Sequence, residues 1–155
     1  RGAITTVDVF AGSPRDLPAV ASVLPYTDYF MPSIEEAQAL CGLSDYSETA
    51  NFFINMGVHA CVLTLGGDGA YYHDRSGRNF RIPAFDIKVK CTCGCGDAFN
   101  AGFAVGLVKG LGIEDIVRLA QATSALNATG LGSQAGVIDY QHTLDFMRNT
   151  KVKAQ

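Results

Sequence analysis

Hydrophobic and polar positions follow two different periods along this chain, and each period predicts one kind of element. Residues 3–10 ("AITTVDVF") are rich in Ile, Thr and Val, which is typical of a strand. Residues 59–67 ("HACVLTLGG") form a continuous apolar run ending in glycines, which is typical of a buried strand. A shorter strand is expected in "DYFMPS", ending at Pro32.

More strands are expected in the middle of the chain. The segments "AYYHD" (70–74) and "NFRIPAF" (79–85) have the pattern of two hairpin strands joined by the turn "RSGR". The segment "IKVK" (87–90) predicts one further short strand.

Most other apolar positions recur at helical spacing. Ser33 is placed to cap a helix that closes at Gly42. Strand and helix alternate through most of the chain, so we expect an α/β layered fold with a mainly parallel sheet. In such folds ligands bind at the carboxyl ends of the strands. The expected helices span residues 17–23, 34–42, 47–56, 97–109, 113–128 and 140–148.

Between Asp97 and Lys109, the helix expected at 97–109 is apolar apart from Asn100, which predicts that it is buried. It begins at a glycine loop and ends at Gly110. Three small residues, Ala101, Gly102 and Gly106, lie on a face where another element would be able to approach closely.

Composition and charge exclude several classes of protein. The 155 residues carry 12 basic and 15 acidic side chains, and without a basic block they do not predict nucleic-acid binding. No apolar run approaches the roughly 20 residues that cross a bilayer, and no secretory pattern is present, so we expect a cytoplasmic protein. The chain runs from Arg1 directly into a strand, so its natural N-terminus is expected to lie elsewhere.

Two glycine-rich turns are the candidate functional segments. One is "TLGGDGAY", after the buried strand, and the other is "GCGDAF", at the start of the buried helix. Glycines let backbone amides approach an anion, and a helix start adds N–H groups and a positive dipole end. Asp97 in the second turn would serve as a general base toward an alcohol. Alone, the first turn would also suit a strand connection, and Asp97 would also suit a helix cap.

The alternating cysteines 91, 93 and 95 raise the alternative of a metal or redox site. Zinc sites use paired Cys-x-x-Cys spacing and four ligands, whereas here the spacing is Cys-x-Cys-x-Cys with no second pair nearby in the sequence. The pattern therefore favours small packing residues around a backbone anion site. The odd total of five cysteines favours reduced thiols over a disulfide framework.

The segment "CTCGCGDAFNAGF" (91–103) resembles the second signature of the ribokinase-like (PfkB) carbohydrate kinases, an Asp-Thr-Thr-Gly-Ala-Gly-Asp run followed by a Phe-x-Ala-Gly helix. Three other segments are similar to parts of that family in the same order: "MPSIEEAQALCG", "VLTLGGDGAYY" and "RLAQATSALNATGLGSQAG". The resemblance implies ATP-dependent phosphorylation of a hydroxyl on a sugar, sugar acid or nucleoside, with Mg²⁺. It covers nearly the whole chain.

The resemblance also implies roles for single residues. Asp97 corresponds to the base that takes the proton from the substrate hydroxyl, and Glu36 to the acidic residue that helps hold Mg²⁺ through water. The anion hole would be formed by Gly94, Cys95 and Gly96. The phosphate or ribose part of ATP would be lined by Thr64, Gly66 and Gly69. The adenine would be flanked by Gln121 and the loop near Gly132.

Two positions depart from the family pattern. Ser33 stands where the family usually has asparagine, which weakens the inferred magnesium and phosphate contacts. Cys91 stands where many members have an aspartate associated with a monovalent-cation site, which weighs against potassium activation. The rival hypothesis is therefore a non-catalytic nucleotide-binding or interaction module on the same scaffold.

Family members are longer than this chain, and their N-terminal half carries most sugar contacts and a β-sheet lid through which many pair. The resemblance thus identifies residues 1–155 as a single partial domain, the C-terminal ATP-binding part of such a kinase. The expected fold is a three-layer, Rossmann-like ribokinase-type fold without that half and lid. A homodimer is expected only of the full-length protein.

Overall fold

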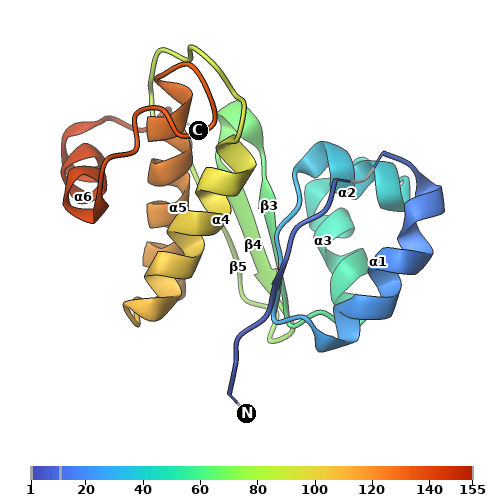
Figure 1. Ribbon diagram of the computed structural model, residues 1–155. Helices are drawn as coiled ribbons and strands as arrows, with labels where there is room; N and C mark the ends of the chain where they lie inside the picture. The colour runs from blue at the N-terminus through green and yellow to red at the C-terminus, as the bar shows by residue number, and fades with distance from the viewer. Residues whose placement is uncertain (1, 11, 155) are drawn as a thin grey trace. The chain divides into compact units, whose positions relative to one another are not determined.

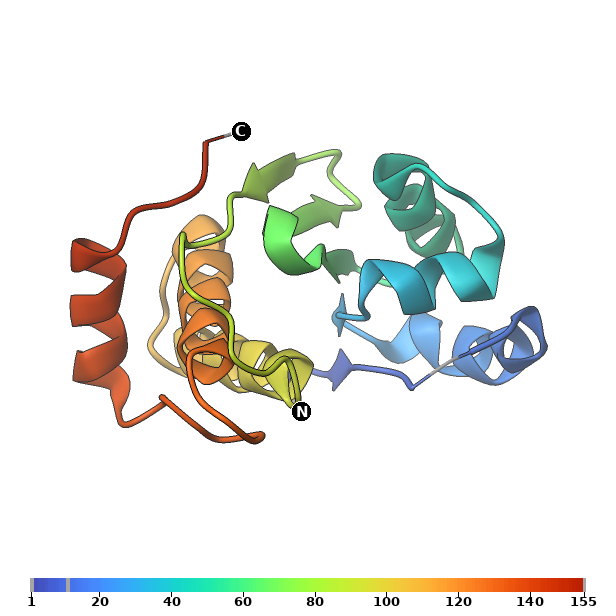
Figure 2. The ribbon, with the colours of Figure 1, turned by 90° about the horizontal axis from the view of Figure 1, so that it is seen from above.

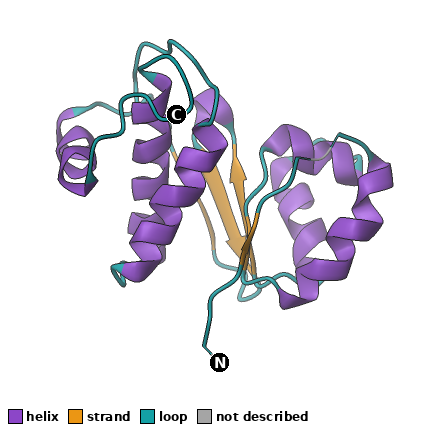
Figure 3. Cartoon of the chain, in the orientation of Figure 1, coloured by secondary structure: helices purple, strands orange, loops and turns teal. Residues whose placement is uncertain are grey.

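The strands form one sheet whose first part is parallel. The computed structural model describes residues 2–10 and 12–154, and in these residues the sheet order is β1 (Thr6–Val7), β2 (Tyr29–Phe30), β3 (Ala60–Thr64), β4 (Ala70–Asp74) and β5 (Asn79–Ile82). Pairing is parallel between β1 and β2 and between β2 and β3. The short turn η3 (Gly66–Asp68) joins β3 to β4, and Figure 3 shows that β4 runs in the opposite direction. The sheet is therefore mixed and mostly parallel.

The chain divides into two units, which are described separately. Unit 1 comprises Arg1–Gly66 and Tyr71–Arg81 and contains nearly all of the sheet, whereas unit 2 comprises Gly67–Ala70 and Ile82–Gln155. Figure 1 shows the helices of each unit gathered together, and Figure 2 shows them from above. The helices of unit 1 are α1 (Leu17–Val23), α2 (Ile34–Cys41) and α3 (Tyr46–Asn55). Those of unit 2 are α4 (Cys95–Val108), α5 (Ile113–Ala128) and α6 (Tyr140–Asn149).

Local signals set both ends of α2 as the sequence predicts. The Ser33 side chain accepts a hydrogen bond from the Glu36 N–H, and the Glu36 carboxylate accepts one from the Ser33 N–H, which forms a capping box at the start of α2. Gly42 ends α2 with a φ of 73°, a left-handed conformation that glycine adopts without strain. Phe30 of β2 and Phe53 of α3 pack edge to face, 4.8 Å apart, in the fully buried core of this unit.

Close packing of α4 on α5 forms the centre of unit 2. A Cβ atom on Gly102 would lie 2.6 Å from Thr123 Oγ1, and one on Gly106 would lie 3.0 Å from a side-chain carbon of Ile116. The predicted close approach at these two glycines is therefore confirmed, whereas Ala101 is exposed. All helices of the described residues are too short or too polar to cross a membrane.

Three of the predicted strands differ in the structure. Residues 3–10 contribute only Thr6–Val7, because β1 lies at the sheet edge and pairs with two residues of β2. The strand expected at 79–85 ends at Ile82, since Pro83 has no N–H to donate. The strand expected at 87–90 is wrong, because the Lys90 N–H donates to the Ala128 carbonyl at the end of α5.

Candidate active site

The start of α4 exposes backbone donors next to a carboxylate. Gly94 is the N-cap residue, with a φ of 71° and no side-chain cap. The first hydrogen bond of the helix runs from Ala98 N to Gly94 O (2.9 Å), so the N–H groups of Gly96 and Asp97 precede it. The Cys95 N–H donates to Thr92 O (3.2 Å), which leaves Gly96 and Asp97 as the donors available to an anion.

Asp97 lies in the first turn of α4 and is exposed. Because the cap position belongs to Gly94, Asp97 does not serve as the helix cap, which was the simpler interpretation of its place in the sequence. Its carboxylate lies beside the positive end of the helix dipole, where a negative charge is stabilised.

Gly94 is held against the loop that follows α5. A Cβ atom on Gly94 would lie 2.6 Å from Ser133 Cβ and 2.9 Å from Ser133 O, closer than any side chain can approach. The left-handed backbone and this contact both require glycine here. The turn "GCGDAF" and the segment "GLGSQAG" are therefore adjacent in unit 2.

Side chains and backbone from α5 hold the loop before α4 in place. Asn127 is fully buried, and its amide Nδ2 donates to Cys93 O (2.8 Å) and lies 3.5 Å from Cys95 Sγ. The Cys95 thiol lies 3.7 Å from Ser124 O, directed at α5. These contacts fix the loop on the last turn of α5, which keeps the start of α4 in one orientation.

Asp97 lines a pocket of about 430 Å³. The pocket lies between α4, α5 and the loop after α5, and its lining is Asp97, Ala98, Ala101, Thr123, Ser133, Gln134 and Val137. A second, smaller pocket of about 190 Å³ shares Ala101, Thr123 and Val137 with the first. The two pockets are therefore neighbours beside the helix start, and we refer to them together as the hollow of unit 2.

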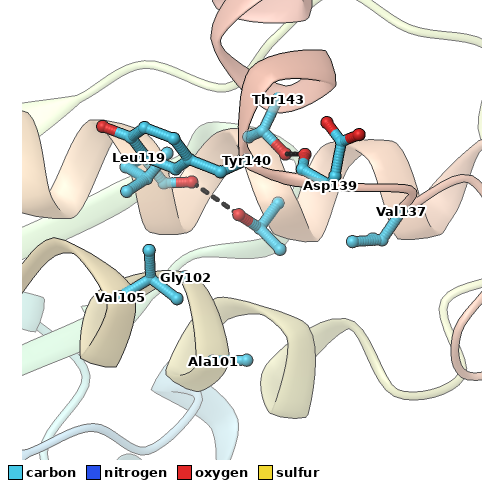
Figure 4. Close-up of a pocket in the computed structure, with 9 residues that line it drawn as sticks. Ala101, Gly102, Val105, Leu119, Val137, Asp139, Tyr140 and Thr143 are labelled. Carbon is cyan, nitrogen blue, oxygen red and sulfur yellow. Dashed lines mark hydrogen bonds between the residues drawn. The ribbon is translucent and has the colours of Figure 1, made fainter.

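The smaller pocket is mostly apolar. Figure 4 shows Val105 on α4 facing Leu119 on α5, with Tyr140 of α6 beside Leu119. Two hydroxyl groups at its rim already have partners, because the Thr123 hydroxyl donates to Leu119 O (2.9 Å) and the Thr143 hydroxyl donates to Asp139 O (3.0 Å). An apolar slot beside backbone N–H donors would accept a flat ring attached to an anionic group.

The predicted residues of unit 1 lie at the carboxyl end of β3. Thr64, the last residue of β3, forms an isolated parallel bridge with Ser33, so the segments "VLTLGG" and "MPSIEE" meet there. One oxygen of Glu36, Oε2, accepts from both the Ser33 N–H (2.9 Å) and the Ser33 hydroxyl (2.7 Å). Gly66 follows with a φ of 55° in the turn η3.

The other predicted positions lie in unit 2. Gly69 has a φ of 100°, and a Cβ atom there would overlap the Ile82 carbonyl. Both the backbone conformation and the close packing against Ile82 therefore require glycine at this position. Gln121 is buried in α5 and is not among the residues that line either pocket, whereas Thr123, two residues later, lines both. Gly132 donates its N–H to the Cys91 sulfur.

Sequence reasoning missed several residues of this site. Ser133, Gln134 and Val137 follow Gly132 in the same glycine-rich loop, and they line the pocket where Gly132 does not. Their proximity to Gly132 was the available signal. Asn127 gave none, because an asparagine near the end of a helix does not reveal which loop its side chain contacts.

The described residues offer no group of three or more His, Cys, Asp or Glu side chains that would hold a metal ion. Mg²⁺ binding by one carboxylate together with substrate phosphates and water does not require such a group, so its absence does not count against the magnesium role that the resemblance implies for Glu36. Cys91 does not suit potassium, because a soft sulfur is a poor ligand for a hard alkali-metal ion. We assign no role to a monovalent cation.

The profile of the pfkB family carbohydrate kinases matches residues 4–139. This chain belongs to that family. A ribokinase from Lactococcus lactis is 34% identical over 115 residues, which are 74% of this chain and 37% of the ribokinase. A pseudouridine kinase from Escherichia coli is 38% identical over 88 residues, which are 57% of this chain and 28% of that kinase.

Solved structures place this pfkB-family chain in the ribokinase fold. The structure of Arabidopsis thaliana ribokinase complexed with ribose and ATP superposes with a TM-score of 0.82 at 26% identity. The superposition covers 95% of this chain and 48% of that structure. The predicted α/β fold of the ribokinase type is confirmed, and the chain spans half or less of the length of these relatives.

Proposed function

We propose that this pfkB-family chain supplies the ATP site and the catalytic base of a kinase that phosphorylates a hydroxyl of a sugar, sugar acid or nucleoside. The observation that carries the proposal is the placement of Asp97. Its carboxylate lines the larger pocket, in the same helical turn as the unbonded N–H groups of the α4 start. A base and an anion-binding site side by side are what phosphoryl transfer to an alcohol requires.

The chain's own residues would divide the reaction between them. Asp97 takes the proton from the acceptor hydroxyl as its oxygen attacks the γ-phosphorus, and the bond to the β-phosphate oxygen breaks. The N–H groups of Gly96 and Asp97, with the helix dipole, stabilise the negative charge of the transferred group. Magnesium, when bound to the nucleotide, would neutralise part of the phosphate charge.

The nucleotide would lie along the hollow in unit 2. The apolar lining between Val105 and Leu119 suits the adenine ring, and the polar end at Ser133 and Asp97 suits the phosphates. The roles of Thr64, Gly66 and Gly69 toward ATP, and of Glu36 toward magnesium, belong to this proposal on the family resemblance. For the adenine, the pocket lining favours Thr123 over Gln121.

The names of the relatives support the substrate class. One matched relative is a ribokinase and another is a pseudouridine kinase, and the superposed ribokinase structure holds ribose and ATP. Because the matches cover only part of those proteins, we propose residues 1–155 as the C-terminal, ATP-binding portion of the kinase.

The experiment is to substitute Asp97→Asn in the full-length natural polypeptide and assay pentoses, hexoses, sugar acids and nucleosides. Turnover should fall by about 100-fold or more, with ATP affinity little changed, because only the proton acceptor is lost. Asp115→Asn is the matched control, because Asp115 lies in the first turn of α5 and lines neither pocket, and it should retain turnover. Equal turnover of Asp97→Asn and wild type would overturn the base assignment.

The rival, a non-catalytic nucleotide-binding or interaction module, is favoured by two features, Ser33 at the position of the family's usual asparagine and the sulfur of Cys91 at the position of the aspartate found in many members. It predicts a different result from the same assay. Saturable ATP binding by wild type without phosphorylation of any acceptor would support the module and contradict the kinase.

A further inference from the structure

Two thiols next to the proposed anion site contact each other. The Cys93 N–H donates to the Cys91 sulfur (3.4 Å), and the two thiols also share a hydrogen bond. The Gly132 N–H donates to the same Cys91 sulfur. One sulfur atom therefore accepts two backbone N–H groups and a neighbouring thiol, which is a set of partners suited to a thiolate.

These contacts change the acidity of both thiols in opposite directions. The N–H donors of Gly132 and Cys93 hold the pKa of Cys91 below its usual value, because hydrogen bonds to sulfur favour the charged form. The hydrogen bond with Cys91 raises the pKa of Cys93. Since the thiolate is the nucleophile, Cys91 is the member of the pair expected to react first.

Accessibility separates this pair from Cys61, whereas Cys41 and Cys95 are half-buried, as Cys91 is. Cys93 is exposed and Cys91 is half-buried, so small reagents can reach both. Cys61 is fully buried, and burial raises the pKa of its thiol. The Cys95 thiol is directed at Ser124 O and Asn127, and it also lies 4.0 Å from the Cys91 carbonyl oxygen.

We propose that Cys91 and Cys93 form a reversible dithiol–disulfide modification site, in which Cys91 is the attacking sulfur and Cys93 the resolving one. The oxidant is a peroxide or a low-molecular-weight disulfide. In an extended segment, residues two apart have Cα atoms about 6.6 Å apart, near the upper end of the range that a disulfide spans.

The chemistry balances with either oxidant. The Cys91 thiolate attacks a disulfide such as oxidised glutathione, forms a mixed disulfide and releases one thiolate. The Cys93 thiol then loses its proton and attacks the Cys91 sulfur, which releases the second thiol. With hydrogen peroxide, Cys91 becomes a sulfenic acid as hydroxide leaves, and attack by Cys93 forms the disulfide and a second water.

The test uses the full chain, reduced, freed of reductant and treated with oxidised glutathione. Mass spectrometry of the alkylated protein should show the loss of two hydrogens, two fewer alkylated thiols at residues 91 and 93, and full reversal by dithiothreitol. In Cys93→Ser the mixed disulfide should accumulate at Cys91, because the resolving sulfur is absent. In Cys91→Ser the reaction at Cys93 should be slower by about 10-fold or more.

The matched control is Cys41→Ser, which should form the bond at the wild-type rate. All variants are checked for an unchanged circular dichroism spectrum. Retention of both reactive thiols in oxidised wild type, or a bond that forms in Cys91→Ser as fast as in wild type, would overturn the proposal. The readout needs no kinase activity, so it is independent of the proposed function.

Discussion

At the scale of single residues, the proposed site separates the group that carries charge from the group that shapes the backbone. Asp97 contributes a carboxylate, whereas Gly94 contributes a left-handed turn with room for Ser133 against it. The sequence revealed Asp97 and the glycines because their types and spacing match a known signature. It did not reveal Ser133 or Asn127, because their contacts are made between segments about 30 or more residues apart, as in the Asn127 contact with Cys93.

The contact at Gly94 leads to a prediction about stability. Gly94→Ala should lower the free energy of unfolding by about 1–2 kcal/mol for the left-handed backbone, and by about 1–3 kcal/mol more for the clash with Ser133. Gly110→Ala is the control, since its φ of 68° is similar but no atom lies within 4 Å of its Cβ position. Equal losses for both variants in urea denaturation would contradict the contact, and Ser133→Gly should partly restore Gly94→Ala.

At the scale of elements, α4 and α5 pack closely because glycines on α4 leave room for α5. This predicts that a favourable helix substitution is harmful here. Gly102→Ala should destabilise the protein by about 1–3 kcal/mol despite the better helix propensity of alanine, because the new Cβ meets Thr123 Oγ1 and Ala120 Cα at 2.6 and 2.9 Å. Gly96→Ala, on the same helix, is the control. No atom lies within 4 Å of the Cβ position there, so the substitution should leave the stability unchanged or raise it. Thermal unfolding of the two variants measures the difference.

The β4–β5 hairpin should depend on pH through Asp74. Burial tends to raise the pKa of this carboxyl, but hydrogen bonds from Ser76 and Tyr72 outweigh it and hold the pKa below its usual 3.8. Because the folded-state pKa is depressed, the stabilisation is present above the unfolded-state value and is lost as pH falls through the folded-state value.

The measurement is chemical denaturation of wild type and Asp74→Asn between pH 7 and pH 2. The stability difference between them should be constant near neutrality and should shrink below about pH 4. A difference that stays constant down to pH 2 would show that ionised Asp74 does not stabilise the hairpin.

At the scale of the whole molecule, the order of helices and strands could be predicted from the sequence more accurately than their first and last residues. The alternation of apolar strands and helices, together with the signature at 91–103, gave the α/β class and the family. The strand expected at 87–90 failed because a strand needs a neighbour, and the backbone of Lys90 pairs with a helix end instead. The role expected for Gln121 depends on which side of α5 lines the pocket, and spacing alone does not decide that.

The central claim is that ATP binds in the hollow of unit 2, next to Asp97. Calorimetric titration with magnesium ATP tests it directly in wild type, in Ala101→Trp and in Ala104→Trp. Ala101 lines both pockets, whereas Ala104 is exposed on the same helix and lines neither. We expect saturable binding by wild type and Ala104→Trp and at least about 10-fold weaker binding by Ala101→Trp, because the indole fills the hollow. Equal binding by the two variants, or no binding by a folded wild type, would contradict the account.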